Sequence, residues 1–212
     1  MIEGAIIGAV VGLIVSLVMM LGRKGTRKKL LETHKTAGLE AARRFLDQKI
    51  PPLTKIPLGK ILDQRERMAA LAILGDLPTI EQEIPAHRGA LTAVIQVNAI
   101  ALLGIAVRSA DPKDAVARLD ALATQMEQEG GATMALVKKK TRALAVLAKG
   151  LTGEPIPSQT RMVLDSLTGD GGMVQLVIWQ AIAQSLEKQG TQLEQAQSLR
   201  RKVQEHTSAF EG

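Results

Sequence analysis

The sequence has no cysteine, no tyrosine, one tryptophan and two phenylalanines among its 212 residues. Without cysteine the chain can form no disulfide scaffold, no thiol nucleophile and no cysteine-ligated metal site. The scarcity of aromatic rings leaves few platforms on which bases could stack, which disfavours single-stranded nucleic-acid binding of the usual kind. We therefore expect no nucleic acid among its partners.

Motifs that carry catalysis are also missing. The three histidines, His34, His87 and His206, lie far apart, and none has a second histidine or a paired carboxylate at metal-ligand spacing. The sequence contains no GxxxxGK[ST] phosphate loop, no HExxH and no GxSxG nucleophile turn. The GDGG stretch at 169–172 precedes a helical pattern without a strand before it, and we interpret it as an inter-helix turn. We expect no metal, no cofactor and no catalytic residue; an enzyme without a local motif stays an alternative.

A long uncharged run, GAIIGAVVGLIVSLVMMLG, occupies residues 4–22. Its 19 residues would form a helix of about 28 Å, close to the roughly 30 Å hydrocarbon thickness of a bilayer. A cleaved signal peptide normally carries positive charge before the apolar stretch, whereas only Glu3 precedes this run. A core helix is the other alternative, but such a helix is rarely apolar on all sides. We predict a retained transmembrane helix over residues 1–22.

A basic segment, RKGTRKK, follows this run directly at residues 23–29. It carries five positive charges, Arg23, Lys24, Arg27, Lys28 and Lys29. By the positive-inside rule, these charges predict a single-pass protein with its N-terminus outside and its C-terminal part in the cytoplasm. They would also attract anionic lipid headgroups. We expect the membrane to be a bacterial inner membrane.

Small residues recur at every fourth position of the run, at Gly4, Gly8, Gly12 and Ser16. On a helix they form one stripe, along which a second backbone could approach closely. The stripe favours a homodimer formed through the span. The alternative is that small residues are simply common in membrane helices, since this spacing is a permissive motif.

The net charge of +6 belongs mostly to the membrane boundary. When the five basic residues of segment 23–29 and Glu3 are set aside, 22 basic and 20 acidic residues remain. A second basic cluster consists of Lys138, Lys139, Lys140 and Arg142. It indicates either a solvated helix face or a patch for lipid or an acidic partner. The mixed charges at 63–67 and 81–83 are typical of solvated helix faces.

Beyond the basic segment the apolar periodicity is helical and predicts an all-α domain. Residues 23–35 form the juxtamembrane segment, and 36–88 form a helical part with a Pro-rich linker. In that part, Leu39, Ala42 and Leu46 mark a short amphipathic helix that ends before Pro51. A helix over about 58–74 follows, closed by Gly75 and Pro78, and then a short helical piece over 79–84.

Residues 89–207 are predicted to form three helical hairpins. Their helices cover about 90–108, 112–129, 132–148, 159–167, 173–188 and 192–206. Asp111 and Pro112 suit the N-cap and first turn of the second of these helices. Because one hairpin cannot bury its apolar face alone, serial hairpins are expected to stack.

The last hairpin resembles a tetratricopeptide repeat. Trp179, Ile182, Ala183, Leu186 and Gly190 follow the spacing of the first helix of that repeat, ending in its turn glycine. The resemblance implies a right-handed stack of helix pairs whose concave face binds peptide segments, commonly as a scaffold. A compact helical bundle is the alternative architecture.

Two polar residues, Gln96 and Asn98, lie inside an otherwise apolar helical stretch. They could bond to a neighbour within the core, which we favour, or line a peptide groove. Taken together, the patterns predict a membrane-anchored helical scaffold that binds partner proteins at the cytoplasmic face. The alternative is a small structural subunit of a membrane complex, held there by its span.

Overall fold

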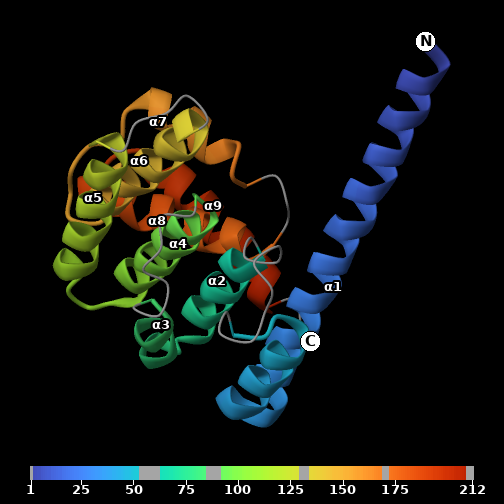
Figure 1. Ribbon diagram of the computed structural model, residues 1–212. Coiled ribbons are helices and arrows are strands. Elements are labelled where there is room, and N and C mark those ends of the chain that lie inside the picture. The colour runs from blue at the N-terminus through green and yellow to red at the C-terminus, as the bar shows by residue number, and fades with distance from the viewer. Residues whose placement is uncertain (1, 53–62, 85–91, 129–133, 169–171, 209–212) are drawn as a thin grey trace.

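The computed structural model describes residues 2–52, 63–84, 92–128, 134–168 and 172–208, with side chains from residue 25 onward except those of 92 and 208. Every regular element in these ranges is a helix, which confirms the all-α prediction (Figure 1). The helices are α1 (Ile2–Lys49), α2 (Gln64–Leu74), α3 (Leu77–Glu83), α4 (Thr92–Arg108), α5 (Lys113–Gln128), α6 (Ala135–Gly150), α7 (Ser158–Asp165), α8 (Met173–Gln189) and α9 (Leu193–Ser208).

The element α1 is two helices joined at Gly38, whose φ of 81° and ψ of −179° interrupt the helical backbone. The Lys29 Nζ atom lies 5.8 Å from the centroid of the Phe45 ring. A straight helix would separate residues 16 positions apart by about 24 Å, so the chain must fold back at Gly38. Leu30 and Leu46, one from each half, are both buried in the core. The short helix predicted before Pro51 is therefore present, although Leu39, predicted to be apolar and inward, is 37% exposed.

The turn from α2 to α3 follows part of the prediction. Gly75 adopts a left-handed conformation (φ 79°) and its N–H bonds to the Ala72 carbonyl, which ends α2 as expected. Pro78 does not close that helix. It lies in the first turn of α3, where Asp76 accepts a hydrogen bond from the Thr79 N–H and proline loses no helical hydrogen bond. The predicted start of α2, at residue 58, lies outside the described ranges.

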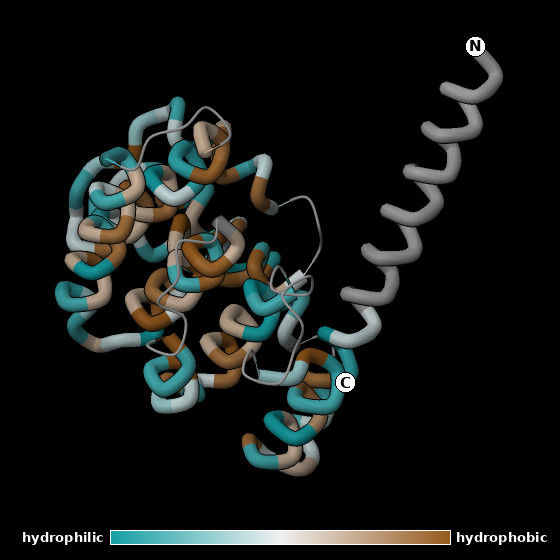
Figure 2. Tube along the Cα trace, viewed as in Figure 1, coloured by the Kyte–Doolittle hydropathy of each residue, from teal (hydrophilic) through white to brown (hydrophobic). Residues whose placement is uncertain are grey.

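The core is formed where α2, α4, α6 and α8 pack around one another, with α5, α7 and α9 on the outside. Figure 2 shows hydrophobic stretches gathered in the middle of this helical body. A Cβ placed on Gly104 would lie 2.6 Å from the Ala72 Cβ, so α2 and α4 approach closely at that point. Contacts of α8 with both α2 and α4 join helices that are distant in sequence. This closed packing differs from the nearest-neighbour stack of an open solenoid.

Helices α4 to α9 correspond to the six predicted in residues 89–207, with ends that agree within three residues. The Asp111 Oδ1 accepts a hydrogen bond from the Lys113 N–H at 3.2 Å, so this side chain satisfies the first turn of α5. In the α8–α9 hairpin, Ile182, Ala183 and Leu186 are buried and Trp179 is half-buried. The resemblance to tetratricopeptide repeats stays a prediction.

Within the ranges whose side chains are described, no helix is both long enough and apolar enough to cross a membrane. The predicted span at 4–22, with its stripe of Gly4, Gly8, Gly12 and Ser16, lies outside those ranges, as do the side chains of Arg23 and Lys24. For this part the structure describes only the helical backbone of α1.

Candidate functional site

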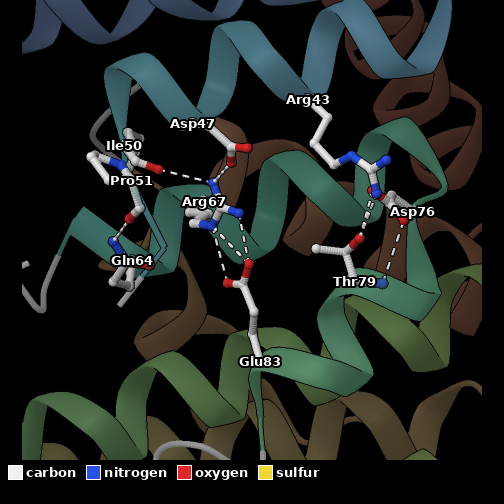
Figure 3. A network of polar contacts seen from close by, with 9 residues as sticks. All are labelled: Arg43, Asp47, Ile50, Pro51, Gln64, Arg67, Asp76, Thr79 and Glu83. Carbon is white, nitrogen blue, oxygen red and sulfur yellow. Dashed lines mark hydrogen bonds and ion pairs between the residues drawn. The ribbon is translucent and has the colours of Figure 1, made fainter. Parts of the chain in front are cut away.

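Arg67 is a buried charged residue of α2, with only 1% of its surface exposed (Figure 3). Its Nε lies 3.0 Å from Glu83 Oε2 and its Nη2 lies 2.6 Å from Glu83 Oε1. Its Nη1 donates to Asp47 Oδ1 at 2.7 Å and to the Ile50 carbonyl at 2.9 Å. Arg67 of α2 thus holds the C-terminal part of α1 and the end of α3 together.

The charge of Arg67 is secured by its acidic neighbours. Burial acts to lower the pKa of Arg67, but the hydrogen bonds and negative charges of Glu83 and Asp47 outweigh it and raise the pKa above its ordinary value. Arg67 is therefore a permanent cation inside the protein. Such a group is tolerated only where its hydrogen bonds are satisfied, which fixes the relative position of the three helices.

Two further contacts extend this joint (Figure 3). The Gln64 Nε2 donates to the Pro51 carbonyl at 2.9 Å, which ties α2 to the end of α1. Arg43 donates from Nη1 to Thr79 Oγ1 at 3.2 Å and lies 3.5 Å from Asp76 Oδ2, at the first turn of α3. The second half of α1 is thus fixed to α2 and α3 along its length by polar contacts. We call this set, Arg43, Asp47, Gln64, Arg67, Asp76, Thr79 and Glu83, the α1 joint.

The α1 joint was not predicted from the sequence. The charged residues at 63–67 and 81–83 were expected on solvated faces, and for Arg67 this was wrong. Its partners Asp47 and Glu83 are 20 and 16 positions away in sequence, so no local spacing indicates that they meet. The mixture of charges around Arg67 is also what an exposed helix shows, and only the packing of α1 and α3 over α2 buries it.

A cavity of about 280 Å³ lies beside the joint, between α1, α2 and the start of α8. Its described lining consists of Thr26, Arg27, Leu30, Leu46, Lys49, Ile50, Asp63, Glu66, Ala70 and Met173. Burial lowers the pKa of Arg27, and the negative charge of Glu66 partly opposes that shift. Arg27, a residue of the predicted basic segment, therefore points into the helical domain instead of only toward lipid.

Glu66 also contacts the turn that precedes α8. Its Oε2 accepts a hydrogen bond from the Met173 N–H at 2.6 Å, and its carboxylate leaves no room for a Cβ on Gly172. The N-terminus of α8 is therefore occupied by a carboxylate of the same chain, where a negative charge is favourable. Gly172 is part of an inter-helix turn, as predicted, while 169–171 lie outside the described ranges.

The second predicted cluster is only partly available to a partner. Arg142 lies 3.3 Å from Asp120 Oδ1 and 3.6 Å from Glu127 Oε1, and the Lys138 Nζ donates to the Glu127 carbonyl at 3.3 Å. Lys139 is exposed and Lys140 is half-buried. Acids of α5 thus offset part of the charge that the sequence places on α6.

The two polar residues of α4 differ in their surroundings. The Gln96 Oε1 accepts a hydrogen bond from Arg65 Nη1 at 3.1 Å, so it bonds to the neighbouring helix α2. Asn98 is half-buried, and its Oδ1 is buried without a hydrogen-bond partner among the described residues. Gln96 also lines a small pocket with Arg65 and Ile100, and a role of either residue in a peptide groove stays a prediction.

The described side chains include no group of three histidines and carboxylates that could hold a metal ion. No protein-family model matches the chain, and no curated protein or solved structure matches it.

Proposed function

We propose that the protein is a membrane-anchored helical scaffold, held by residues 4–22 and presenting its helical domain to partner proteins at the cytoplasmic face. The observation that carries the proposal is the uncharged 19-residue run followed at once by five basic residues in seven positions. The backbone of this run belongs to α1, which continues as one helix past the basic segment to Gly38.

The α1 joint gives the anchor a mechanical role. The folded-back half of α1, at 39–49, is fixed to α2 and α3 by Arg67, and Leu30 of the first half is buried in the core. A domain attached in this way is held near the bilayer by ordered structure instead of a loose linker. Confinement of this kind raises the local concentration of both partners, so even weak peptide contacts become effective.

Exposed apolar side chains on the outer helices support a partner-binding face. Met162 of α7 is 75% exposed and Leu193 of α9 is 52% exposed. The Arg161 Nη1 donates to Gln192 Oε1 at 2.7 Å, which places the residues before Met162 and Leu193 in contact. We propose that these two exposed apolar side chains belong to the surface that a partner covers.

Anchoring is tested by alkaline carbonate extraction of cell membranes. The full chain should remain in the membrane pellet, and a variant lacking residues 1–22 should move to the supernatant, because it has lost its apolar run. The matched control replaces 4–22 by an alanine and leucine run of equal length, which should restore pelleting. Extraction of the full chain by carbonate would refute the anchor.

Partner binding by the proposed face is tested by paired substitutions and co-purification. Met162→Ser with Leu193→Ser should reduce the partners recovered, whereas Leu39→Ser, on an exposed leucine of α1, should not. Equal recovery from both variants would mean that this face is not the one used.

A second candidate, a structural subunit held in a complex by its span, is favoured by the small-residue stripe at Gly4, Gly8, Gly12 and Ser16. The two candidates differ when residues 1–22 are removed. A scaffold keeps its partners in that variant, whereas a subunit held by its span loses its complex. Gly8→Ile, which should disturb close helix packing, tests the homodimer by self-association of the span.

A further inference from the structure

A groove of about 420 Å³ lies among five helices on a different part of the domain from the α1 joint. Its described lining is Leu31, His34 and Lys35 of α1, Ile73 of α2, Arg108 of α4, Gln180 of α8, and Val203 and Thr207 of α9. The volume falls in the range of small-molecule sites, which is about 300 to 1,000 Å³.

The lining of the groove is positive and contains no acid among its described residues. Arg108 and Lys35 are cations, and the His34 imidazole can form hydrogen bonds through its ring nitrogens. Arg108 and His34 form no hydrogen bond or ion pair with the other described residues, unlike Arg67, Arg118, Arg142 and Arg200, which all have carboxylate partners. An arginine that lines a groove without an acid is available for an anion from outside.

The remaining lining divides into two kinds. The Gln180 amide can donate hydrogen bonds, whereas the Thr207 hydroxyl already donates to the Val203 carbonyl at 3.0 Å. Leu31, Ile73 and Val203 form an apolar wall. The groove therefore combines a cationic side with an apolar side, which suits an anion that carries a small organic body.

We propose that this groove binds a phosphomonoester with a compact organic group. A phosphomonoester carries nearly two negative charges at neutral pH and three acceptor oxygens, which match the two cations Arg108 and Lys35 better than one carboxylate would. The planar guanidinium of Arg108 can bond two phosphate oxygens at once.

Such a ligand could be free in solution or could be the headgroup of an anionic lipid. His34 lies 12 residues after Gly22 along the same helix, which is about 18 Å along its axis. That separation exceeds the thickness of one headgroup layer, about 5 to 8 Å, and so favours a ligand free in solution. The choice of a ligand free in solution rests on the proposed span at 4–22, whereas binding at the groove does not, so either proposal can fail alone.

The test measures binding of glycerol 3-phosphate to the full chain in a detergent with uncharged headgroups, by calorimetry. A second readout is the fluorescence of Trp179, the chain's one tryptophan, which neighbours Gln180 and stacks on His206 with ring centroids 5.7 Å apart. The variant is Arg108→Gln. The matched control is Arg201→Gln, which removes the same charge from an exposed site on α9 outside the groove.

We expect saturable binding by the unmodified chain and by Arg201→Gln, and binding about tenfold or more weaker in Arg108→Gln, because a charge-assisted hydrogen bond is lost. Circular dichroism of each variant checks that the fold is kept. An absence of binding to the unmodified chain, or an equal loss in both variants, would overturn the proposal.

The source of the phosphate is tested by placing the full chain in bilayer nanodiscs of phosphatidylcholine with or without phosphatidic acid. For a ligand free in solution, glycerol 3-phosphate should bind equally in both. A different result would be that phosphatidic acid competes with glycerol 3-phosphate in the unmodified chain but not in Arg108→Gln. In that case the groove would still be a phosphomonoester site, and its ligand would be a lipid headgroup. Competition that Arg108→Gln leaves unchanged would place the phosphate elsewhere and refute the site.

Discussion

Two arginine–glutamate pairs with the same chemistry hold different regions of this protein together. In the α1 joint, Arg67 meets Glu83 with side-chain exposures of 2% and 14%. In the α8–α9 hairpin, Arg200 meets Glu187 through two hydrogen bonds of 2.5 and 2.6 Å, with exposures of 50% and 35%. Judged by their hydrogen-bond distances alone, the two pairs would be expected to contribute equally to stability.

Their surroundings make them different. An exposed pair exchanges its contact for water at little cost, so it contributes about 0.2 to 1 kcal/mol. A buried pair has lost its water already, and removing one partner leaves a charge without compensation, at a cost of about 3 to 5 kcal/mol. The α8–α9 hairpin is therefore held mainly by its apolar contacts, whereas the position of α1 depends on charge.

The largest expected effect comes from breaking the buried pair. Glu83→Ala should lower the free energy of unfolding by about 3 kcal/mol or more, because Arg67 keeps only Asp47 as a charged partner. Thermal unfolding of the full chain in detergent, followed by circular dichroism, measures this. The control is Glu205→Ala at an exposed position of α9; equal effects of the two variants would show that the buried pair has no special role.

A close apolar contact in the core should give the next largest effect. Gly104→Ala places a Cβ 2.6 Å from that of Ala72, so α2 and α4 must move apart. Overpacking of this kind costs about 1 to 3 kcal/mol. The same unfolding measurement tests it, with Gly25→Ala as the control, since a Cβ on Gly25 meets no atom within 4 Å. A neutral Gly104→Ala would mean that the helices separate without cost.

Breaking the exposed pair should have a small effect. Arg200→Ala should lower the free energy of unfolding by about 1 kcal/mol or less, and added salt should reduce the difference further. Unfolding at low and high salt provides the measurement. A loss as large as that of Glu83→Ala would contradict the comparison between the two regions.

The smallest effect is the pH dependence of the stability that this exposed pair contributes. The hydrogen bond from Arg200 lowers the pKa of Glu187 below its ordinary value of 4.5, more than burial raises it. The pair's contribution is therefore present above pH 4.5 and is lost as the pH falls through the lowered pKa. The stability curves of the unmodified chain and Arg200→Ala should converge under acid; a gap that stays constant there would exclude this linkage.

Local signals in the sequence predicted much of the fold. The turn at Gly75 and the cap at Asp111 depend on neighbouring residues, and both occur where predicted. The fold-back at Gly38 and the burial of Arg67 were not predicted, because each depends on helices that meet only in the folded chain. The same limit applies to the phosphomonoester groove, since Arg108 and His34 are 74 positions apart and no spacing links them.

The proposed membrane anchor, with the helical domain in the cytoplasm, can be tested by labelling a single introduced cysteine. Because the chain has no cysteine of its own, Lys139→Cys, at an exposed position of α6, gives one unique site. With a maleimide that cannot cross membranes, we expect no labelling in intact cells and full labelling of the membrane fraction once the cells are opened. Labelling in intact cells would contradict the predicted orientation, and labelled protein outside the membrane fraction would contradict the anchor.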